Sequence, residues 1–366
     1  MRQFVKMIFG LVIFTIFIIA SKPAMADIVH IERDFYVYNA PVFGAQRIAM
    51  FEPQNVNVIE YGELGWAKIN SSFGDVWLRL YEPQNSLEGR VIILDAGHGI
   101  ENSPRFANYV ESVKMLELAF LIKDLLEAQG ATVLLTRTNQ HDIHLTQRVA
   151  QINIWSLEYL RQIYTNALHI ALHDDNQTHY IVNQIWNIEW LINEMQNVLD
   201  DWQQYAPIYF NFPFDRERET AINPVLHRIF QLQANPIISD NFLMISLHSN
   251  ATGTPVNTAI HGVDIYHMSN DNAASEYYFA NYANVDANRN FAEILIDNID
   301  RIGIERRYIR QGNFFIIREH NLPSVLVENG FHTNEANRTL LMEPWFLARL
   351  AEAYEDAIIR YFVVDR

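Results

Sequence analysis

Three apolar runs in this sequence each end in a polar side chain, and this pattern limits the folds that the chain can adopt. The runs are VIIL before Asp95, NFLMISL before His248 and PSVLV before Glu328. Runs of four to seven aliphatic residues bounded by turn-forming residues indicate buried strands, which are typical of parallel sheets. In open α/β sheets, ligands bind beyond the carboxyl ends of the strands. We therefore expect the three polar positions to meet at one edge of a sheet.

The residues around the first and second runs form a candidate metal site. His98 lies between two glycines, so the backbone can turn sharply and present its ring at the strand tip. Glu111 follows 13 residues later, at the first turn of a predicted helix that should start near the same tip. His248 ends the most apolar run, where an unpaired polar side chain would be costly. Two imidazoles and one carboxylate suit Zn²⁺, with a fourth position left for water.

Glu328 is the carboxylate that remains after these three ligands are assigned. It precedes Asn-Gly at a strand end, so its side chain is also expected at the sheet edge. Taken alone, such a glutamate is more often a helix cap or part of a surface ion pair. Beside a zinc ion that lowers the pKa of a bound water, its natural role is general base. The four residues together predict a hydrolytic zinc site.

Two other sets of residues offer alternative chemistry. A second metal site would need the following side chains, of which the first two are four positions apart on a predicted helix: His169, His173, Asp174, Asp175 and His179. Position 170 is Ile, so the zinc-protease pattern with a glutamate there is absent. Ser249 follows His248, but no Gly-x-Ser-x-Gly sequence surrounds it, which argues against a serine hydrolase.

The composition excludes several classes of protein. Hydrophobic residues make up 49% of the 366 positions, which is too many for a disordered chain. The 43 acidic residues outnumber the 27 basic ones and give a net charge of −16, which argues against nucleic acid as a partner. The chain has no cysteine, so it contains neither disulfides nor thiolate metal ligands.

Residues 1–26 have the pattern of a secretory signal peptide. A basic start with Arg2 and Lys6 precedes a 14-residue apolar stretch, and Ala24-Met25-Ala26 supplies small residues for cleavage. The alternative is an uncleaved membrane anchor, for which the apolar stretch is short. The chain is therefore expected outside the cytoplasmic membrane, in the periplasm or cell envelope.

The remaining chain is predicted to form two domains. Residues 27–85 contain short alternating segments separated by Gly, Pro, Asn and Ser, which indicates a small all-β domain. This segment resembles a bacterial SH3-like domain. The resemblance implies a cell-wall peptide binder, and a packing or spacer module with Trp66 and Trp77 in its core is the equal alternative. A linker at 82–90 then leads into a second domain that covers residues 86–366.

The second domain is predicted to be α/β, with a mostly parallel six-stranded sheet, flanking helices and a large helical insertion at about 154–240. Expected helices outside the insertion cover about 111–129, ending at Gly130, about 288–302 and about 344–361. The six expected strands are 91–95, 131–136, 242–247, 263–267, 314–317 and 324–328.

Five ordered strings resemble the zinc-dependent N-acetylmuramoyl-L-alanine amidases: DAGHG, Glu111, TRTNQHDIHLTQRVAQIN, SLHSNA and LPSVLVENGFHTNEANRTLL. The resemblance implies zinc ligands at His98, Glu111 and His248 and a catalytic carboxylate at Glu328. It also implies that Arg137 and the Asp142–Leu145–Arg148 pattern are scaffold around the second strand. The family hydrolyses the amide between the lactyl group of N-acetylmuramic acid and L-alanine, so peptidoglycan would be the substrate.

The sequence departs from this family at two places. Ile100 follows Gly99 where the family usually has a second glycine, so the loop is expected to have a different shape. An insertion of 87 residues, 154–240, precedes the third-ligand strand. It is a candidate for autoinhibition, for gauging substrate length or for docking a protein activator. Its four tryptophans favour the core of a helical hairpin over a ligand groove: Trp155, Trp186, Trp190 and Trp202.

Two further functions remain open at this level. One is a zinc peptidase or amidohydrolase that acts on another amide bond of the wall. The other is a non-catalytic wall-binding regulator in which the insertion covers the metal.

Overall fold

The computed structural model describes residues 27–31, 35–41, 47–52, 54–61, 66–79, 87–171, 175–210, 223–268 and 284–364. The predicted signal segment and most of the predicted linker lie outside these ranges. Contacts between Cα atoms divide the chain into two units, one made of residues 1–41 and 47–80 and the other of residues 42–46 and 81–366.

The first unit is an antiparallel sheet, in agreement with the all-β prediction. Its strands pair in the order β1-β4-β5-β6-β2-β3. Their bounds are β1 Asp27–Ile31, β2 Phe35–Tyr38, β3 Arg47–Phe51, β4 Gln54–Tyr61, β5 Trp66–Ser71 and β6 Gly74–Arg79. Alternate aliphatic residues such as Val56 and Val58 build its core. Trp66 is buried and Trp77 is half-buried, while the SH3-like resemblance stays a prediction.

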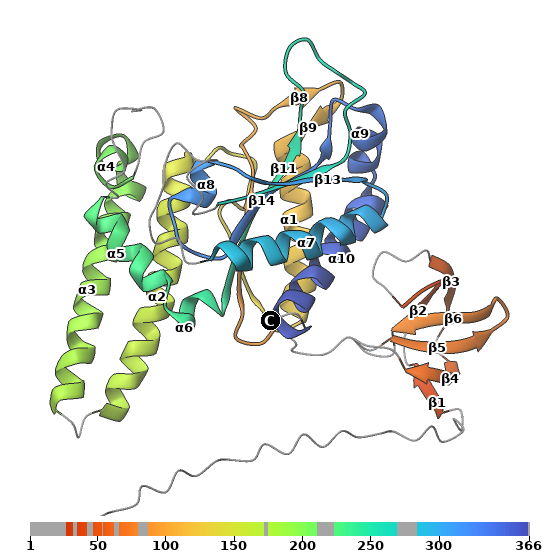
Figure 1. The fold of residues 1–366 in the computed structure, drawn as a ribbon, viewed down its shortest axis with the longest axis horizontal. Helices are drawn as coiled ribbons and strands as arrows, with labels where there is room; N and C mark the ends of the chain where they lie inside the picture. Colours follow the sequence, from red (N-terminus) through yellow and green to blue (C-terminus); the bar gives the residue numbers. More distant parts are fainter. Residues whose placement is uncertain are drawn as a thin grey trace, which may run out of the picture. The chain divides into compact units, whose positions relative to one another are not determined.

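The second unit contains the predicted six-stranded, mostly parallel sheet (Figure 1). Its order is β10-β7-β11-β14-β12-β13, in which only the β14–β12 pair is antiparallel. The strands are β7 Val91–Ala96, β10 Thr132–Leu135, β11 Phe242–Asn250, β12 Val263–His267, β13 Arg306–Gln311 and β14 Ser324–Phe331. Strands β7, β11 and β14 lie next to one another in the middle of the sheet and are almost fully buried, which is why all three are aliphatic runs.

One of the six predicted strands is wrong. The apolar run at 314–317 forms a buried helical turn, α8 Phe315–Arg318, and the sixth strand is β13. A short apolar run does not distinguish a strand from a buried helix, because both bury all of their side chains. Strand β13 lies at the edge of the sheet and alternates exposed with half-buried residues, so its sequence RRYIRQ lacks an aliphatic signal.

Helices α1 Glu111–Ala128, α10 Pro344–Ile359 and α7 Val285–Arg301 pack side by side against the sheet (Figure 1). Gly130 follows the α1 cap with φ of +85°, which confirms the predicted helix-ending glycine. A π-helical turn, Arg360–Val364, extends α10 beyond the expected helix end. Short elements complete this unit: β8 Arg105–Phe106, β9 Tyr109–Val110 and α9 Glu335–Met342.

The insertion is helical in its described part, as predicted, and continues a helix that begins before it. Its helices are α2 Leu145–Ala171, α3 Asp175–Asp200, α4 Trp202–Tyr209, α5 Pro224–Gln233 and α6 Pro236–Ser239. Residues from α2, α3 and α5 share one hydrophobic core with β7, β11 and β14. The prediction for its tryptophans is only half right: Trp155 and Trp202 pack against this core, whereas Trp186 and Trp190 are 66% and 45% exposed.

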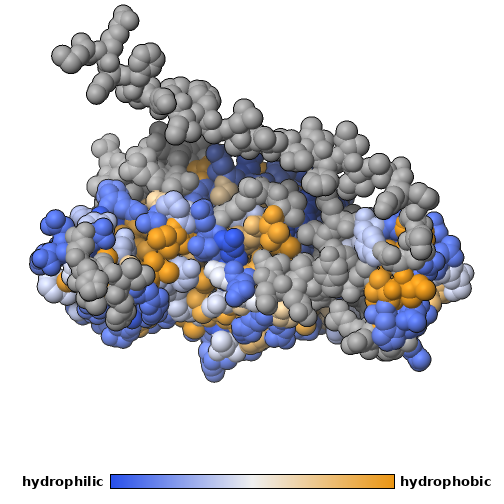
Figure 2. Space-filling model, turned by 90° about the horizontal axis from the view of Figure 1, so that it is seen from below, coloured by the Kyte–Doolittle hydropathy of each residue, from blue (hydrophilic) through white to orange (hydrophobic). Residues whose placement is uncertain are grey.

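The surface mixes polar and apolar residues. Figure 2 shows hydrophilic residues interspersed with separate hydrophobic patches on the face that it presents. Among the residues that the structure describes, no helix is both long and apolar enough to cross a membrane.

Candidate metal centre

His98 is placed by a tight turn directly after β7. Its backbone is left-handed, with φ of 59°, a conformation that few non-glycine residues adopt. A Cβ atom on Gly97 would lie 2.3 Å from Cε1 of His248, and one on Gly99 would lie 2.2 Å from the Cα of Asp142. Both neighbours must therefore be glycine, which agrees with the role that the sequence suggested for them.

Two buried arginines hold the carbonyl groups of this turn. Arg148, from α2, donates from Nη1 to the Ala96 carbonyl at 2.8 Å and from Nη2 to the His98 carbonyl at 2.8 Å. Arg137 donates from Nε to the Ala96 carbonyl at 2.7 Å and from Nη2 to the Gly97 carbonyl at 3.1 Å. The scaffold role expected for these arginines thus extends to the loop after the first strand.

Asp95 anchors the same network and is fully partnered. Its Oδ1 accepts from Thr136 Oγ1 at 2.5 Å and from Arg148 Nη1 at 3.1 Å, and its Oδ2 accepts from Ser246 Oγ at 2.8 Å. Burial raises the pKa of Asp95, but Arg148, Thr136, His248 and Ser246 outweigh it and hold the pKa below its usual value. Asp95 is therefore a structural carboxylate of the loop.

Glu111 begins α1 and points at both histidines. Its Oε1 accepts from Nδ1 of His248 at 3.0 Å and lies 3.6 Å from Nε2 of His98. The backbone N–H of Ser249 donates to the same oxygen at 3.1 Å. One potential ligand atom from each of His98, Glu111 and His248 falls within 4.8 Å of the others. The structure therefore brings the three predicted ligands together.

The spacing of these atoms fits a tetrahedral zinc ion. With zinc–ligand bonds of about 2.0–2.2 Å, neighbouring ligand atoms lie about 3.3–3.6 Å apart. The distance of 3.6 Å from Glu111 Oε1 to His98 lies at the upper end of this range, and the distance of 3.0 Å to His248 lies just below it. A donor set of two imidazoles and one carboxylate also suits zinc better than it suits the oxygen-seeking Mg²⁺ or Ca²⁺. These three residues could hold a zinc ion.

The ionisable groups of the cluster shift one another's pKa values. Burial disfavours a charge on His248, but its hydrogen bond to Glu111 and the nearby carboxylates raise the pKa to about 9. Burial likewise opposes the charge of Glu111, yet the bonds from His248 and Ser249 and the proximity of His98 keep its pKa low. Burial lowers the pKa of His98. Glu111 is therefore ionised, as a metal ligand must be.

Glu328 lies beside His248 on the neighbouring strand. The two residues are register partners in the parallel β11–β14 pair, so their side chains leave the same face of the sheet about 5 Å apart. Its Oε2 atom is buried without a hydrogen-bond partner among the described residues. Burial, assisted by Glu111 and Asp264, raises the pKa of Glu328 to about 8 in spite of His248. A buried carboxylate with an unpaired oxygen is suited to proton transfer.

Three residues next to Glu111 form a hydrogen-bonded group that the sequence did not indicate, and one of them, Ser249, bonds directly to Glu111. Tyr109 donates its hydroxyl to Ser249 Oγ at 2.9 Å, and Ser249 Oγ lies 3.0 Å from Nδ1 of His332. The His332 ring stacks on Tyr109 with centroids 5.1 Å apart. Ser249 thus belongs to the site through its hydrogen bonds, and no sequence motif signals the pair that flanks it.

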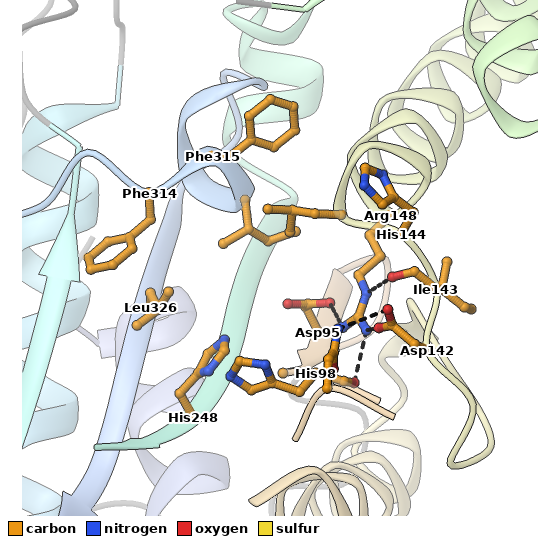
Figure 3. A pocket seen from close by; sticks show the side chains of 14 residues that line it. Asp95, His98, Asp142, Ile143, His144, Arg148, His248, Phe314, Phe315 and Leu326 are labelled. Carbon is orange, nitrogen blue, oxygen red and sulfur yellow. Dashed lines mark hydrogen bonds and ion pairs between the residues drawn. The ribbon is translucent and has the colours of Figure 1, made fainter. Parts of the chain in front are cut away.

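A cavity of about 310 Å³ lies beside the two histidines (Figure 3). His98, His248 and the Arg148 network form one side, and its wall includes His144 and Phe315. The ring of His144 stacks at 3.5 Å on Trp202 of the insertion. His141 is exposed and contacts Glu101. The side chains of His169 and His173, named above for a second metal site, lie outside the described residues.

Comparison with known proteins assigns the second unit to a family. The family model described as N-acetylmuramoyl-L-alanine amidase matches residues 92–180 and 228–360, more than half of the chain. An uncharacterized cell wall amidase of Bacillus anthracis is 21% identical over 342 residues, which cover 91% of this chain and 58% of that protein. The N-acetylmuramoyl-L-alanine amidase CwlM of Bacillus licheniformis is 34% identical over 79 residues, 21% of this chain and 31% of that protein.

The chain thus spans less than two thirds of these curated relatives. Among solved structures, the N-acetylmuramoyl-L-alanine amidase AmiC2 of Nostoc punctiforme aligns over 75% of this chain and 97% of its own, with 17% identity and a TM-score of 0.43. On the strength of the family match, this chain belongs to the N-acetylmuramoyl-L-alanine amidase family.

Proposed function

We propose that this protein is a zinc-dependent N-acetylmuramoyl-L-alanine amidase that hydrolyses the amide between N-acetylmuramic acid and L-alanine in peptidoglycan. Family membership supports the reaction. The observation that carries the assignment is the meeting of His98, Glu111 and His248 with the unpaired carboxylate of Glu328. A metal-binding triad and a separate proton acceptor are the parts that hydrolysis of an amide by activated water requires.

In this proposal His98, Glu111 and His248 would hold the zinc ion. The bound ion supplies Lewis acidity and lowers the pKa of a coordinated water. Glu328 takes the proton of the attacking water at Oε2 and delivers it to the nitrogen of the leaving L-alanine. The bonds of Arg148 and Ser249 keep the His98 backbone and the Glu111 carboxylate in place, so both ligands are oriented before a metal binds.

Analysis of the reaction products tests the proposal. Zinc-loaded protein incubated with purified peptidoglycan should release stem peptides whose new amino terminus is L-alanine, detected by mass spectrometry after amino-terminal labelling. The same incubation with Glu328→Gln should yield far less of these peptides. Release of peptides with any other new amino terminus would instead indicate a peptidase that cuts within the stem peptide.

The domain organisation and location belong to the same proposal. We propose a signal peptide at 1–26, an SH3-like domain at 27–85 and a catalytic domain at 86–366, and the division of contacts between Leu80 and Tyr81 supports the boundary between the two domains. Action on peptidoglycan requires a location in the periplasm or cell envelope. Amino-terminal sequencing of the protein recovered from cells should then begin at Asp27.

A further inference from the structure

The cavity beside the candidate metal centre has walls that are mostly apolar. Six of its lining residues are aliphatic or aromatic: Ile143, Leu145, Phe314, Phe315, Ile316 and Leu326. His98 and His248 line the same cavity, so a group held in it lies close to the candidate metal centre (Figure 3). Its volume of about 310 Å³ is at the lower end of the range for small-molecule sites.

The charged groups in the walls are bound to one another. Arg148 directs its three nitrogens to oxygens of the protein, including the carboxylates of Asp95 and Asp142. Apart from the two histidines of the candidate metal centre, the wall carries two carboxylates and one guanidinium, which together have one net negative charge. Within this lining no further Lys or Arg is present to pair with an anion. The walls therefore disfavour a group that carries a carboxylate, since its charge would be desolvated without a partner.

The insertion supports two of the lining residues from outside the cavity. Trp202 stacks on His144 with ring centroids 3.5 Å apart and planes at 11°, and Phe210 packs edge-on against Phe315 at 5.5 Å. Gln147 donates to the Leu199 carbonyl at 2.8 Å and joins α2 to the end of α3. No described residue of 154–240 lines the cavity itself. In its described part the insertion is a fixed support of the wall and not a cover.

His144 has one ring nitrogen available to a ligand. Its Nδ1 pairs with Thr146 Oγ1 at 2.7 Å, and no described residue hydrogen-bonds its Nε2. An apolar cavity with an aromatic wall and a few neutral hydrogen-bonding groups, among them His144 and Asn102, suits a sugar ring with an acetamido substituent, which has an apolar face, a methyl group and uncharged polar atoms.

We propose that this cavity binds the N-acetylmuramoyl part of the substrate and that Trp202 of the insertion positions His144 for this contact. The inference rests on the proposed amidase function and adds to it the location of the sugar. The stem peptide, which carries carboxylates, then extends away from the cavity on the other side of the metal centre.

Calorimetric binding to zinc-loaded protein in a Glu328→Gln background tests the assignment. The two probes are N-acetylmuramoyl-L-alanyl-D-isoglutamine and the same dipeptide without the sugar. Trp202→Ala and His144→Ala should each weaken binding of the sugar-containing probe about threefold to tenfold, the range expected for the loss of one aromatic pair. Binding of the bare dipeptide should not change, and Trp202→Phe should restore most of the affinity.

Trp186→Ala is the matched control, because Trp186 lies on the same insertion but is exposed. This variant should bind both probes as the parent does, and zinc affinity should be equal in all variants. Equal weakening for both probes, or none for either, overturns the sugar assignment. Thermal unfolding of each variant identifies any loss due to misfolding, and His144→Ala then decides the outcome if Trp202→Ala does not fold.

Turnover measured in proteins that keep Glu328 separates this inference from the proposed function. With normal Glu328, the His144 and Trp202 variants should raise KM for release of L-alanyl peptides and leave kcat within about twofold. Sugar-dependent binding without any release of L-alanyl peptides would refute the amidase proposal and retain the sugar site. Release with unchanged KM in both variants would refute the sugar site and retain the amidase.

Discussion

At the scale of single residues, the site consists of a few reactive side chains held by many that do not react. His98, Glu111 and His248 could hold the metal, and Glu328 is the carboxylate with an unpaired oxygen. Arg137 and Arg148 bind the carbonyls of the loop, while Ser249 binds Glu111. Because these supporting bonds are buried, loss of one should affect folding as well as geometry.

Glu328→Gln separates the proton acceptor from the metal site. The amide keeps the size of the side chain but cannot accept the proton, so we expect kcat to fall by about 10²–10⁴. Zinc affinity should stay within about threefold, since Glu328 is not one of the three proposed ligands. Mass spectrometry of released amino termini and metal analysis after gel filtration provide the two measurements. A rate within tenfold of wild type would refute the role.

Arg148→Ala should destabilise the fold strongly. The variant leaves the Asp95 carboxylate and the His98 carbonyl without their donor, and breaking one partner of a buried ion pair costs about 3–5 kcal/mol. Denaturant unfolding monitored by circular dichroism gives the free energy. Arg161→Ala is the control, because the Arg161–Glu189 pair is exposed and contributes at most about 1 kcal/mol. Equal losses in the two variants would contradict the anchoring role of Arg148.

His320 makes the stability depend on pH. Burial lowers its pKa from 6.5 to about 4, and its Nε2 has no partner among the described residues. As the pH falls below 6.5 the unfolded chain binds the proton first, so stability is complete above this pH and is lost towards pH 4. The loss amounts to about 3 kcal/mol.

The His320→Asn variant isolates this contribution. Asparagine keeps an acceptor for the Leu322 N–H, which lies 3.2 Å from Nδ1 of His320, but does not titrate. Lowering the pH from 7 to 4.5 should therefore reduce the free energy of unfolding of the wild type more than that of the variant. Parallel pH curves for the two proteins would show that His320 does not titrate as proposed.

At the scale of elements, the insertion is part of the second unit. Its helices share a core with β7, β11 and β14. A buried amide network also joins it to the loop before β14: Gln233 bonds Asn153 and Ser156 at 2.9 Å each and accepts from the Asn321 N–H at 2.6 Å. Since β14 carries Glu328, removal of 154–240 should disrupt the site together with the fold.

A pair of point variants tests this view of the insertion without deleting it. Leu191 is fully buried in the shared core, so Leu191→Ala should lower the free energy of unfolding by about 2–5 kcal/mol. Trp186→Ala on the same helix should change it by less than about 1 kcal/mol, because that side chain is exposed. A single cooperative transition that shifts in Leu191→Ala would agree with one shared core. A small effect of Leu191→Ala would indicate an independently folded insertion.

At the scale of the whole molecule, metal binding and stability should be linked. The three proposed ligands come from α1, from β11 and from the loop after β7, so an ion that binds them favours the folded state alone. Zinc at 100 times its Kd should add about 2.7 kcal/mol, visible as a higher Tm in calorimetry, and chelation should reverse it. Glu111→Gln should abolish most of the increase. An equal zinc effect in this variant would place the ion elsewhere.

Several features followed from local sequence patterns. The aliphatic runs that became β7, β11 and β14 were recognisable because strands buried on both faces consist mainly of aliphatic residues. The parallel order of these strands places their carboxyl ends at one edge, so the convergence of His98, His248 and Glu328 was predictable from where each run ended. The glycines beside His98 were informative because the left-handed turn and the close approach of His248 exclude a Cβ.

Other features depended on contacts between distant segments. The run at 314–317 forms α8, and β13 forms the edge of the sheet. An edge strand can carry charged residues because one of its faces stays exposed. Tyr109 and His332 flank Ser249 only because β9 and the residue after β14 both lie next to the end of β11. Trp186 and Trp202 both belong to the insertion, yet one is exposed and the other stacks on His144. Local sequence preferences specify which residues must be buried and which must form turns. The residue that each of them contacts is decided by packing between distant segments, in some cases more than 200 positions apart in the sequence.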